Sequence, residues 1–167
     1  MDALSEPRPT GREHTLRPRL EYAKAAPGAA RAMAGLETYV RSCGLEPALL
    51  ELVSMRASQI NGCAYCLDMH SKDARAAGES EQRLYTLPAW RETPFFTERE
   101  RAALAWTEAL TAIADTGAPE DAFEQARQHF SDKELVDLTM GIVAINGWNR
   151  LAIGFRSVPG THQPRPR

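Results

Sequence analysis

Apolar residues recur at helical spacing along most of the chain, and breaker and capping residues divide this pattern into segments. Pro27 stands near the start of one segment and Gly44 just past its end, an arrangement typical of a helix. The sequences TERE at 97–100 and SDKE at 131–134 are capping boxes, which open two further helices. The pattern predicts helices over residues 27–43, 47–60, 63–77, 80–87, 98–115, 120–130 and 132–155, with a loop at 88–94.

The last predicted helix is unusual because apolar residues cover most of its circumference. They are Leu135, Val136, Leu138, Met140, Ile142, Val143, Ile145, Trp148, Leu151 and Ile153. Such a helix is buried on all sides, and in a chain of this size its second face often packs on another subunit. Gly141, Gly147 and Gly154 are costly inside a helix and make sense where backbones approach closely. We therefore expect a homo-oligomer.

The composition favours helices over sheets. The chain has 26 Ala but only five Val and five Ile. Alanine is the best helix former, whereas β-branched residues favour strands. No run alternates apolar and polar residues for long enough to build a sheet. The predicted fold class is all-α, which excludes the Rossmann, thioredoxin and TIM-barrel folds because each needs parallel strands.

The length of 167 residues predicts one domain with flanking segments. Residues 1–20 are rich in Pro and Arg, and we expect an extended or disordered arm there. Residues 21–157 are expected to form the helical domain. The polar, Pro-rich residues 158–167 predict a disordered tail.

Charge and hydropathy limit the partners. A net charge of −2 argues against a nucleic-acid-binding protein, which calls for a basic patch. No stretch reaches the roughly 18 apolar residues of a membrane span. The first twenty residues lack the apolar core of a signal peptide. We expect a cytoplasmic protein that binds neither nucleic acid nor membrane.

The segment CAYCLDMH at 63–70 carries the candidate chemistry. On a helix that begins at Cys63, residues three and four apart share a face, so Cys66 lies one turn on and His70 one turn further. The positive end of the helix favours a thiolate, and CxxC cysteines there often have a lowered pKa. His70 can accept a proton from Cys66. Such a pair can cycle between dithiol and disulfide without a metal or cofactor.

Two other interpretations of this segment stay open. The two cysteines can be inert core residues that happen to fall three positions apart. Alternatively, the CxxC thiols and His70 form a zinc site. That site would need a fourth ligand from Cys43, Glu51, His129 or water, and the second ligand pair of a typical structural zinc site is missing.

These residues resemble the AhpD-like alkylhydroperoxidases, a family within the carboxymuconolactone decarboxylase superfamily. The family motif is a Glu, then CxxC twelve residues later, then a His four residues after the second Cys. This chain has Glu51, Cys63, Cys66 and His70 at those positions. The sequences MRASQINGCAYCLDMHSKDARAAGES and WRETPFFTERERAALAWTEALT also look like the single-repeat branch, so the resemblance covers roughly residues 20–155.

The resemblance implies an AhpD-like helical bundle with the CxxC at a helix N-terminus, assembled into trimers or hexamers. It implies a thiol-dependent peroxidase with peroxiredoxin-type activity. Cys66 then attacks the hydroperoxide, Cys63 resolves the product to a disulfide, and Glu51 and His70 relay protons. A lipoyl-type or thioredoxin-like dithiol reduces the disulfide, most easily at Cys63 if that sulfur lies nearer to solvent. Spacing alone favours Cys63 as the nucleophile, whereas the resemblance and the spacing to His70 favour Cys66.

Tyr65 departs from the family pattern. In the best-known alkylhydroperoxidases the residue before the second Cys is a second relay histidine. A phenol with a pKa of about 10 cannot shuttle protons at neutral pH, although it can donate a hydrogen bond. The alternatives are therefore a general disulfide oxidoreductase or redox sensor without peroxide specificity, or a zinc-binding interaction module. Lactone decarboxylation is not expected, because the decarboxylase branch lacks this CxxC pair.

The positions of Glu51, Trp90 and Trp148 relative to the site depend on the direction in which each side chain points. The apolar stripe of the helix over 47–60 leaves Glu51 on the opposite, solvated side, whereas the resemblance places it in the site. Trp90 is expected at an entrance to the site, and Trp148 in the core or at a subunit interface.

Overall fold

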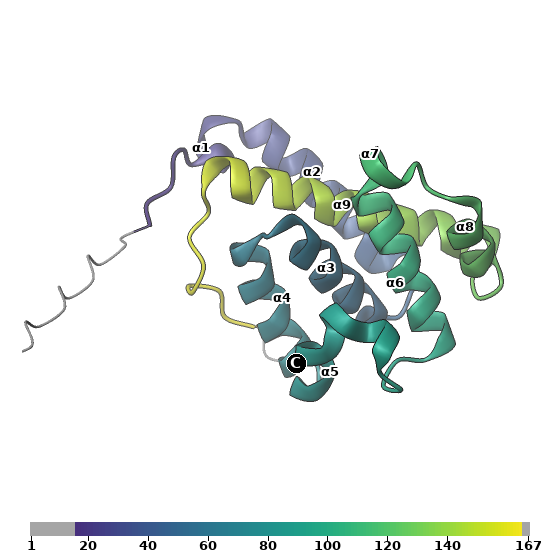
Figure 1. Cartoon of the computed structure of the whole chain (residues 1–167). Coiled ribbons are helices and arrows are strands. Elements are labelled where there is room, and N and C mark those ends of the chain that lie inside the picture. The colour runs from purple at the N-terminus through teal and green to yellow at the C-terminus, as the bar shows by residue number, and fades with distance from the viewer. Residues whose placement is uncertain (1–15, 165–167) are drawn as a thin grey trace, which may run out of the picture.

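A computed structural model describes residues 16–164 as a bundle of helices (Figure 1). The helical segments are α1 (Tyr22–Ala25), α2 (Pro27–Ser42), α3 (Pro47–Asn61), α4 (Ala64–Ala76), α5 (Glu81–Thr86), the 3₁₀ helix η1 (Leu87–Glu92), α6 (Glu98–Thr111), α7 (Ile113–Thr116), α8 (Glu120–Arg127) and α9 (Asp132–Phe155). No strand occurs between residues 16 and 164, which confirms the predicted all-α class.

Capping residues set several helix boundaries where the sequence predicts them. Thr97 and Ser131 cap α6 and α9, and both form complete capping boxes. The predicted helix over 98–115 divides into α6 and α7 because Ala112 leaves helical geometry, with φ −100° and ψ 33°. The predicted loop at 88–94 is mostly the helix η1, because the buried side chains of Leu87 and Trp90 hold it against the core.

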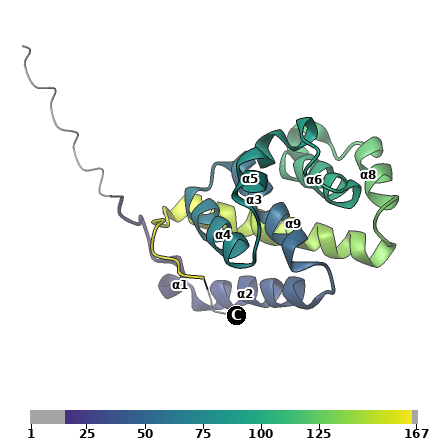
Figure 2. The same ribbon diagram turned by 90° about the horizontal axis from the view of Figure 1, so that it is seen from below.

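Helix α9 is the centre of the bundle. It crosses the whole molecule in Figure 1, and α2, α3, α4 and α6 all pack on it. Helix α3 contacts α4, α6 and α9. Figure 2 shows α2 running along the side of the bundle away from α5 and α6. Helices α2, α3, α4 and α9 therefore meet on one side of the molecule, where the candidate site lies.

The apolar circumference of α9 is only partly buried. Leu138 and Ile142 lie in the core, with exposed fractions of 0% and 1%, but Val136 and Val143 are 60% and 50% exposed. The expectation that this helix is buried on all sides is therefore wrong, because the neighbouring helices of the described chain cover only part of it. The homo-oligomer stays a prediction.

Close helix packing accounts for two of the three α9 glycines. A Cβ at Gly147 would lie 2.8 Å from Met33 Cε, and one at Gly141 would lie 3.3 Å from Leu50 Cδ2. A Cβ at Gly154 would have no neighbouring atom of the described residues within 4 Å, so close approach does not explain this glycine.

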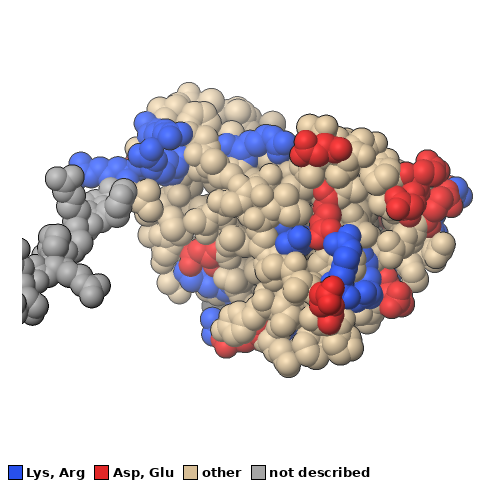
Figure 3. Space-filling model, in the orientation of Figure 1, with Lys and Arg blue, Asp and Glu red and all other residues tan. Residues whose placement is uncertain are grey.

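Ion pairs join the helices at the surface. Arg99 of α6 binds Glu134 of α9 at 2.7 Å and Glu46 at 2.9 Å, and Arg83 binds Glu100 at 2.6 Å. On the face shown in Figure 3, many basic and acidic side chains accordingly lie next to each other.

The Glu134→Gln variant tests how the α9 capping box depends on charge. Hydrogen bonds from the backbone and hydroxyl of Ser131, together with Arg99, lower the pKa of Glu134 to about 2. The carboxylate therefore stabilises the fold above its unfolded pKa, and this stability is lost as the pH falls toward 2. We expect the variant to lose about 0.5 kcal/mol of unfolding free energy at pH 7, with the difference vanishing near pH 2. Urea denaturation at several pH values measures this, and an equal loss at every pH would contradict it.

The N-terminal part of the described chain lies against the end of α9. The Arg19 backbone N–H donates to Phe155 O at 2.9 Å, and its guanidinium donates to Gly154 O at 3.1 Å. Residues 1–15 of the predicted arm lie outside the described residues.

The segment after α9 follows a defined path along α4. The Gly160 backbone N–H donates to Asp68 Oδ2 at 2.9 Å, and His162 Nε2 lies 2.7 Å from Asp73 Oδ1. The sequence predicts a disordered tail for residues 158–164. The composition of this segment does not reveal the carboxylates of α4 that bind it. Residues 165–167 lie outside the described residues. In the described part of the chain no helix is long and apolar enough to cross a membrane.

Candidate active site

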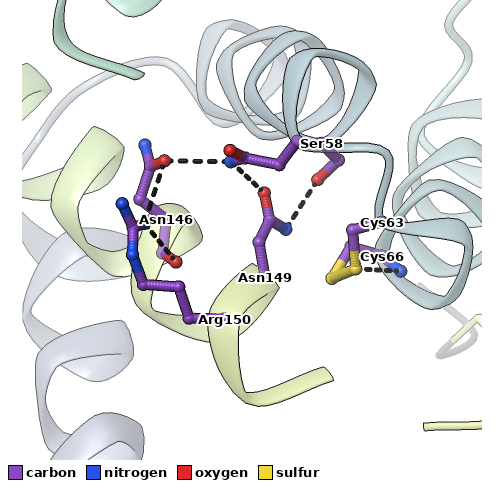
Figure 4. Close-up of a disulfide and its surroundings, with 7 residues drawn as sticks. Ser58, Cys63, Cys66, Asn146, Asn149 and Arg150 are labelled. Atoms are coloured by element: carbon purple, nitrogen blue, oxygen red, sulfur yellow. Dashed lines mark hydrogen bonds between the residues drawn. A yellow bond between two sulfur atoms is a disulfide. The ribbon is translucent and has the colours of Figure 1, made fainter. Parts of the chain in front are cut away.

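The turn between α3 and α4 fixes the position of the first cysteine. Gly62 adopts the left-handed conformation with φ +68°, which ends α3. The chain then reverses, and the Cys63 backbone N–H donates to Ser58 O at 2.9 Å. Cys63 becomes the N-cap of α4, and its Sγ accepts a hydrogen bond from the Cys66 backbone N–H at 3.3 Å (Figure 4). A thiolate at this position would receive both that N–H and the positive end of α4.

The two cysteines of the CxxC sequence form a disulfide. Their Cα atoms lie 5.4 Å apart, as expected for positions one turn apart. Cys63 and Cys66 are 1% and 2% exposed, and they pack with Ala57, Ile145 and Ala152. The predicted placement of the pair at the start of a helix is confirmed.

A histidine–carboxylate pair lies beside the disulfide. His70 Nδ1 on α4 lies 2.7 Å from Glu51 Oε2 on α3. His70 is buried, and the Glu51 side chain is only 19% exposed. The apolar pattern of α3 wrongly suggested a solvated Glu51, because α4 packs over the face that this pattern leaves polar. The bond to Nδ1 leaves Nε2 as the ring nitrogen for exchange with a substrate or a thiol.

A cavity of about 310 Å³ opens onto the second cysteine. Its lining residues are Tyr22, Glu37, Arg41, Tyr65, Cys66, Met69, His70, Trp148 and Ala152. Cys66 and His70 therefore share one cavity wall, whereas Cys63 does not line it. A volume near the lower end for small-molecule pockets suits a compact organic substrate.

Several residues of the cavity wall were not predicted from the sequence. Trp148, expected in the core or at a subunit interface, lines this cavity. Trp90, expected at the entrance to the site, is buried and donates its indole N–H to Glu108 Oε1 at 2.9 Å. Arg41 and Glu37 form an ion pair at 2.8 Å in the cavity wall. Glu37 and Arg41 come from α2 and Trp148 comes from α9, so no local motif around the CxxC could have identified them.

Two tyrosines, Tyr22 and Tyr65, line the cavity. Burial raises the pKa of Tyr22 above its usual value, and the neighbouring Tyr65 raises it further. Tyr22 therefore stays protonated at neutral pH and acts as a hydrogen-bond donor. Tyr65 occupies the position where the family pattern has a second relay histidine, and here it forms part of the cavity wall.

A buried polar network supports the turn before Cys63 (Figure 4). Asn149 of α9 donates to Ser58 Oγ at 3.0 Å, and Asn61 donates to Asn149 Oδ1 at 2.8 Å and to Asn146 Oδ1 at 2.9 Å. Arg150 adds a bond to the backbone carbonyl of Asn146 at 2.9 Å. The network ties α9 to the end of α3 and so holds the turn that places Cys63. Its only sign in the sequence is the presence of Asn146, Asn149 and Arg150 in an otherwise apolar helix.

Asn149→Ala is expected to destabilise the protein by about 2–4 kcal/mol. The substitution removes two hydrogen bonds, leaves the buried Ser58 hydroxyl without its partner and leaves the Asn61 amide with its bond to Asn146 alone. Urea denaturation measures the loss. The matched control is Arg150→Ala at the exposed edge of the same network, which should cost about 1 kcal/mol or less. Equal losses in the two variants would contradict a structural role for the buried part.

The third cysteine lies apart from this site. Cys43 is half-buried at the end of α2 and has a free thiol. Among residues 16–164, no group of three or more His, Cys, Asp or Glu side chains is arranged so that it could hold a metal ion. The ligand set required by the zinc interpretation is therefore not assembled there.

Comparison with known proteins identifies the family. The family model of the carboxymuconolactone decarboxylase family matches residues 27–109, which include α2, α3 and α4 with Glu51, the CxxC and His70. A solved structure from Agrobacterium tumefaciens, of a protein of unknown function described as "Putative Antioxidant Defence Protein AhpD", is 53% identical to this chain. It covers 87% of this chain and all of its own, with a TM-score of 0.84. The chain belongs to the AhpD-like carboxymuconolactone decarboxylase superfamily.

Other relatives of this AhpD-like protein differ in what is known of them. The uncharacterized protein YdfG of Bacillus subtilis is 40% identical over 137 residues, which are 82% of this chain and 93% of YdfG. The debrominase Bmp8 has a TM-score of 0.74 but only 21% identity, over 83% of this chain and 74% of Bmp8, so the likeness shows the fold alone. The AhpD-like family suggests a peroxidase-related function.

Proposed function

We propose that this AhpD-like protein is a thiol-dependent peroxidase that reduces hydroperoxides through a Cys63–Cys66 dithiol/disulfide cycle. The observation that carries the proposal is that Cys66 shares a cavity wall with His70 and lies in a disulfide with Cys63. The cavity gives a hydroperoxide access to one sulfur, and the second sulfur is already within bonding distance. The pair of His70 and Glu51 provides a route for protons.

The first step is attack by the Cys66 thiolate on the distal oxygen of the hydroperoxide. His70 takes the thiol proton, and Glu51 orients the ring through Nδ1. The O–O bond breaks, the alkoxide leaving group takes the relayed proton and departs as an alcohol, and Cys66 becomes a sulfenic acid. Tyr65 and Tyr22 can donate hydrogen bonds in the same cavity.

The second step closes the disulfide. The Cys63 sulfur attacks the Cys66 sulfur, an S–S bond forms, and the hydroxyl leaves with a proton as water. The N-cap position of Cys63 favours the thiolate needed for this attack. An external dithiol then restores both thiols and is itself oxidised to a disulfide. No metal or other cofactor takes part in this cycle.

The partners in this proposal are a hydroperoxide and a dithiol reductant of the lipoyl type or the thioredoxin-like type. We also propose that the protein acts in the cytoplasm as a trimer or hexamer, without nucleic acid or membrane as a partner. The exposed Val136 and Val143 of α9 are consistent with a covered surface in such an assembly.

Loss of free thiols after addition of hydroperoxide tests the proposal. Fully reduced protein is mixed with one equivalent of an organic hydroperoxide, and the remaining thiols are counted over time. Fast loss of two thiols, with Cys43 untouched, is the expected result. Loss no faster than that of an ordinary free thiol would contradict the peroxidase function.

One observation favours a second candidate, a general disulfide oxidoreductase or redox sensor. Tyr65, which cannot relay protons at neutral pH, occupies the cavity wall where the family pattern has histidine. In that case small or protein disulfides would oxidise the dithiol faster than hydroperoxides do. The two oxidation rates, measured on the same reduced protein, distinguish the candidates.

A further inference from the structure

The two sulfurs of the disulfide differ in how a reductant can reach them. Cys66 lines the cavity of about 310 Å³, together with Met69, His70 and Trp148. Cys63 is absent from this wall and is 1% exposed, in the packed cluster with Ala57. Attack at Cys63 was expected only if that sulfur lies nearer to solvent, and its exposed fraction is no larger than the 2% of Cys66.

The two sulfurs also differ as leaving groups. In thiol–disulfide exchange the attacking thiolate binds one sulfur, and the other sulfur leaves as a thiolate, faster when that thiolate is more stable. The Cys66 backbone N–H donates to Cys63 Sγ at 3.3 Å, and Cys63 caps the positive end of α4. The fold thus stabilises negative charge on Cys63, the sulfur that is displaced when Cys66 is attacked.

We propose that the reductant attacks Cys66, through the same cavity that admits the oxidant, and that Cys63 is the leaving group. This assignment rests on the dithiol/disulfide cycle of the proposed function. A reductant thiolate forms an S–S bond with Cys66, the Cys63–Cys66 bond breaks, and Cys63 leaves as a thiolate. A second thiol of the reductant then attacks the reductant sulfur of this mixed disulfide, which releases the Cys66 thiolate and oxidises the reductant to its own disulfide.

The consequence is that Cys66 performs the chemistry of both half-reactions. It is attacked in the oxidised protein and attacks in the reduced protein, whereas Cys63 never contacts either external substrate. A reductant must therefore carry its thiol on a group slender enough to enter the cavity beside Met69 and Trp148.

Mapping the mixed disulfide tests the assignment. The full-length protein is oxidised with diamide, so that no peroxide is involved, and is mixed with excess 2-mercaptoethanol. Acid stops the exchange after short times, free thiols are blocked, and peptide fragmentation locates the adduct. We expect the adduct on Cys66 to exceed that on Cys63 by at least about tenfold. An adduct mainly on Cys63, or equal amounts on both, would overturn the assignment.

Two substitutions on α4 provide a second, independent readout. Met69→Trp narrows the cavity without touching Cys63, and it should slow disulfide reduction by 2-mercaptoethanol by at least about tenfold. Ala64→Trp places the same bulk at the exposed position next to Cys63 and should leave the rate unchanged. Slower reduction in Ala64→Trp, with the rate unchanged in Met69→Trp, would overturn the assignment.

The two proposals can fail separately, because diamide makes the disulfide without peroxide. An adduct on Cys66 without any peroxide turnover would contradict the proposed peroxidase alone. Peroxide turnover with an adduct on Cys63 would contradict this inference alone.

Discussion

The Cys66→Ser variant is expected to reduce hydroperoxide at least about 10³-fold more slowly than the unaltered protein. Serine keeps the size of the side chain but is not a nucleophile at neutral pH, and removal of a nucleophile typically costs this much or more. The cavity contains no second thiol that could replace it, because Cys63 lies outside the cavity wall. Stopped-flow measurement of peroxide consumption by the reduced protein, with the reductant in excess, gives the rate.

Two matched variants make this result specific. Without added reductant, Cys63→Ser should consume one equivalent of hydroperoxide and keep a sulfenic acid on Cys66 that a dimedone-type reagent traps. Cys43→Ser should behave like the unaltered protein, since Cys43 lies apart from the cavity. If Cys66→Ser keeps its activity and Cys63→Ser loses it, the roles of the two cysteines are reversed.

His70→Asn is expected to lower the rate of the peroxide step by about 10²–10⁴-fold, the usual contribution of a general acid–base group. Asparagine is of similar size and can still bind Glu51, but it cannot accept a proton from Cys66. The rate of sulfenic acid formation, measured from pH 5 to 9, separates this effect from misfolding. At high pH, where the Cys66 thiol ionises without help, the variant should recover part of the lost rate.

Glu51→Gln is the comparison for His70→Asn. Its amide can still bind Nδ1, so His70 stays in place, but the charge that stabilises an imidazolium is gone. The loss should be smaller, about 10–100-fold, and the pH profile should shift instead of flattening. If Glu51→Gln lowers the rate as far as His70→Asn at every pH, Glu51 does more than position the ring.

Local sequence signals were enough to predict much of the fold. Capping boxes, proline near helix starts and glycine at helix ends act within one or two turns, so the starts at Glu98 and Asp132 and the end of α2 before Gly44 follow from the sequence. Features that depend on tertiary packing did not follow. The helix η1 packs on α3 through buried side chains, a contact that single-helix patterns do not contain, and the break at Ala112 has no signal in the local pattern.

The candidate site divides in the same way. Cys63, Cys66 and His70 lie within two turns of one helix, so their shared face follows from helical periodicity. The place of Glu51 followed only from family resemblance, since its own helix suggested solvent. Periodicity placed both sulfurs at the start of α4, but it could not show that only Cys66 borders the cavity. That difference depends on Tyr22 and Trp148, which come from opposite ends of the chain.

The N-cap role of Cys63 changes what an alanine substitution would report. Its sulfur accepts the hydrogen bond that begins α4, in addition to its proposed role in forming the disulfide. Alanine would remove both the thiol and the cap, at a structural cost of about 1 kcal/mol, whereas serine is among the preferred N-cap residues. Lost activity in an alanine variant would therefore mix a frayed helix end with a missing resolving thiol. A serine variant isolates the chemistry, and a comparison of the two would measure how much of the active-site order depends on one helix cap.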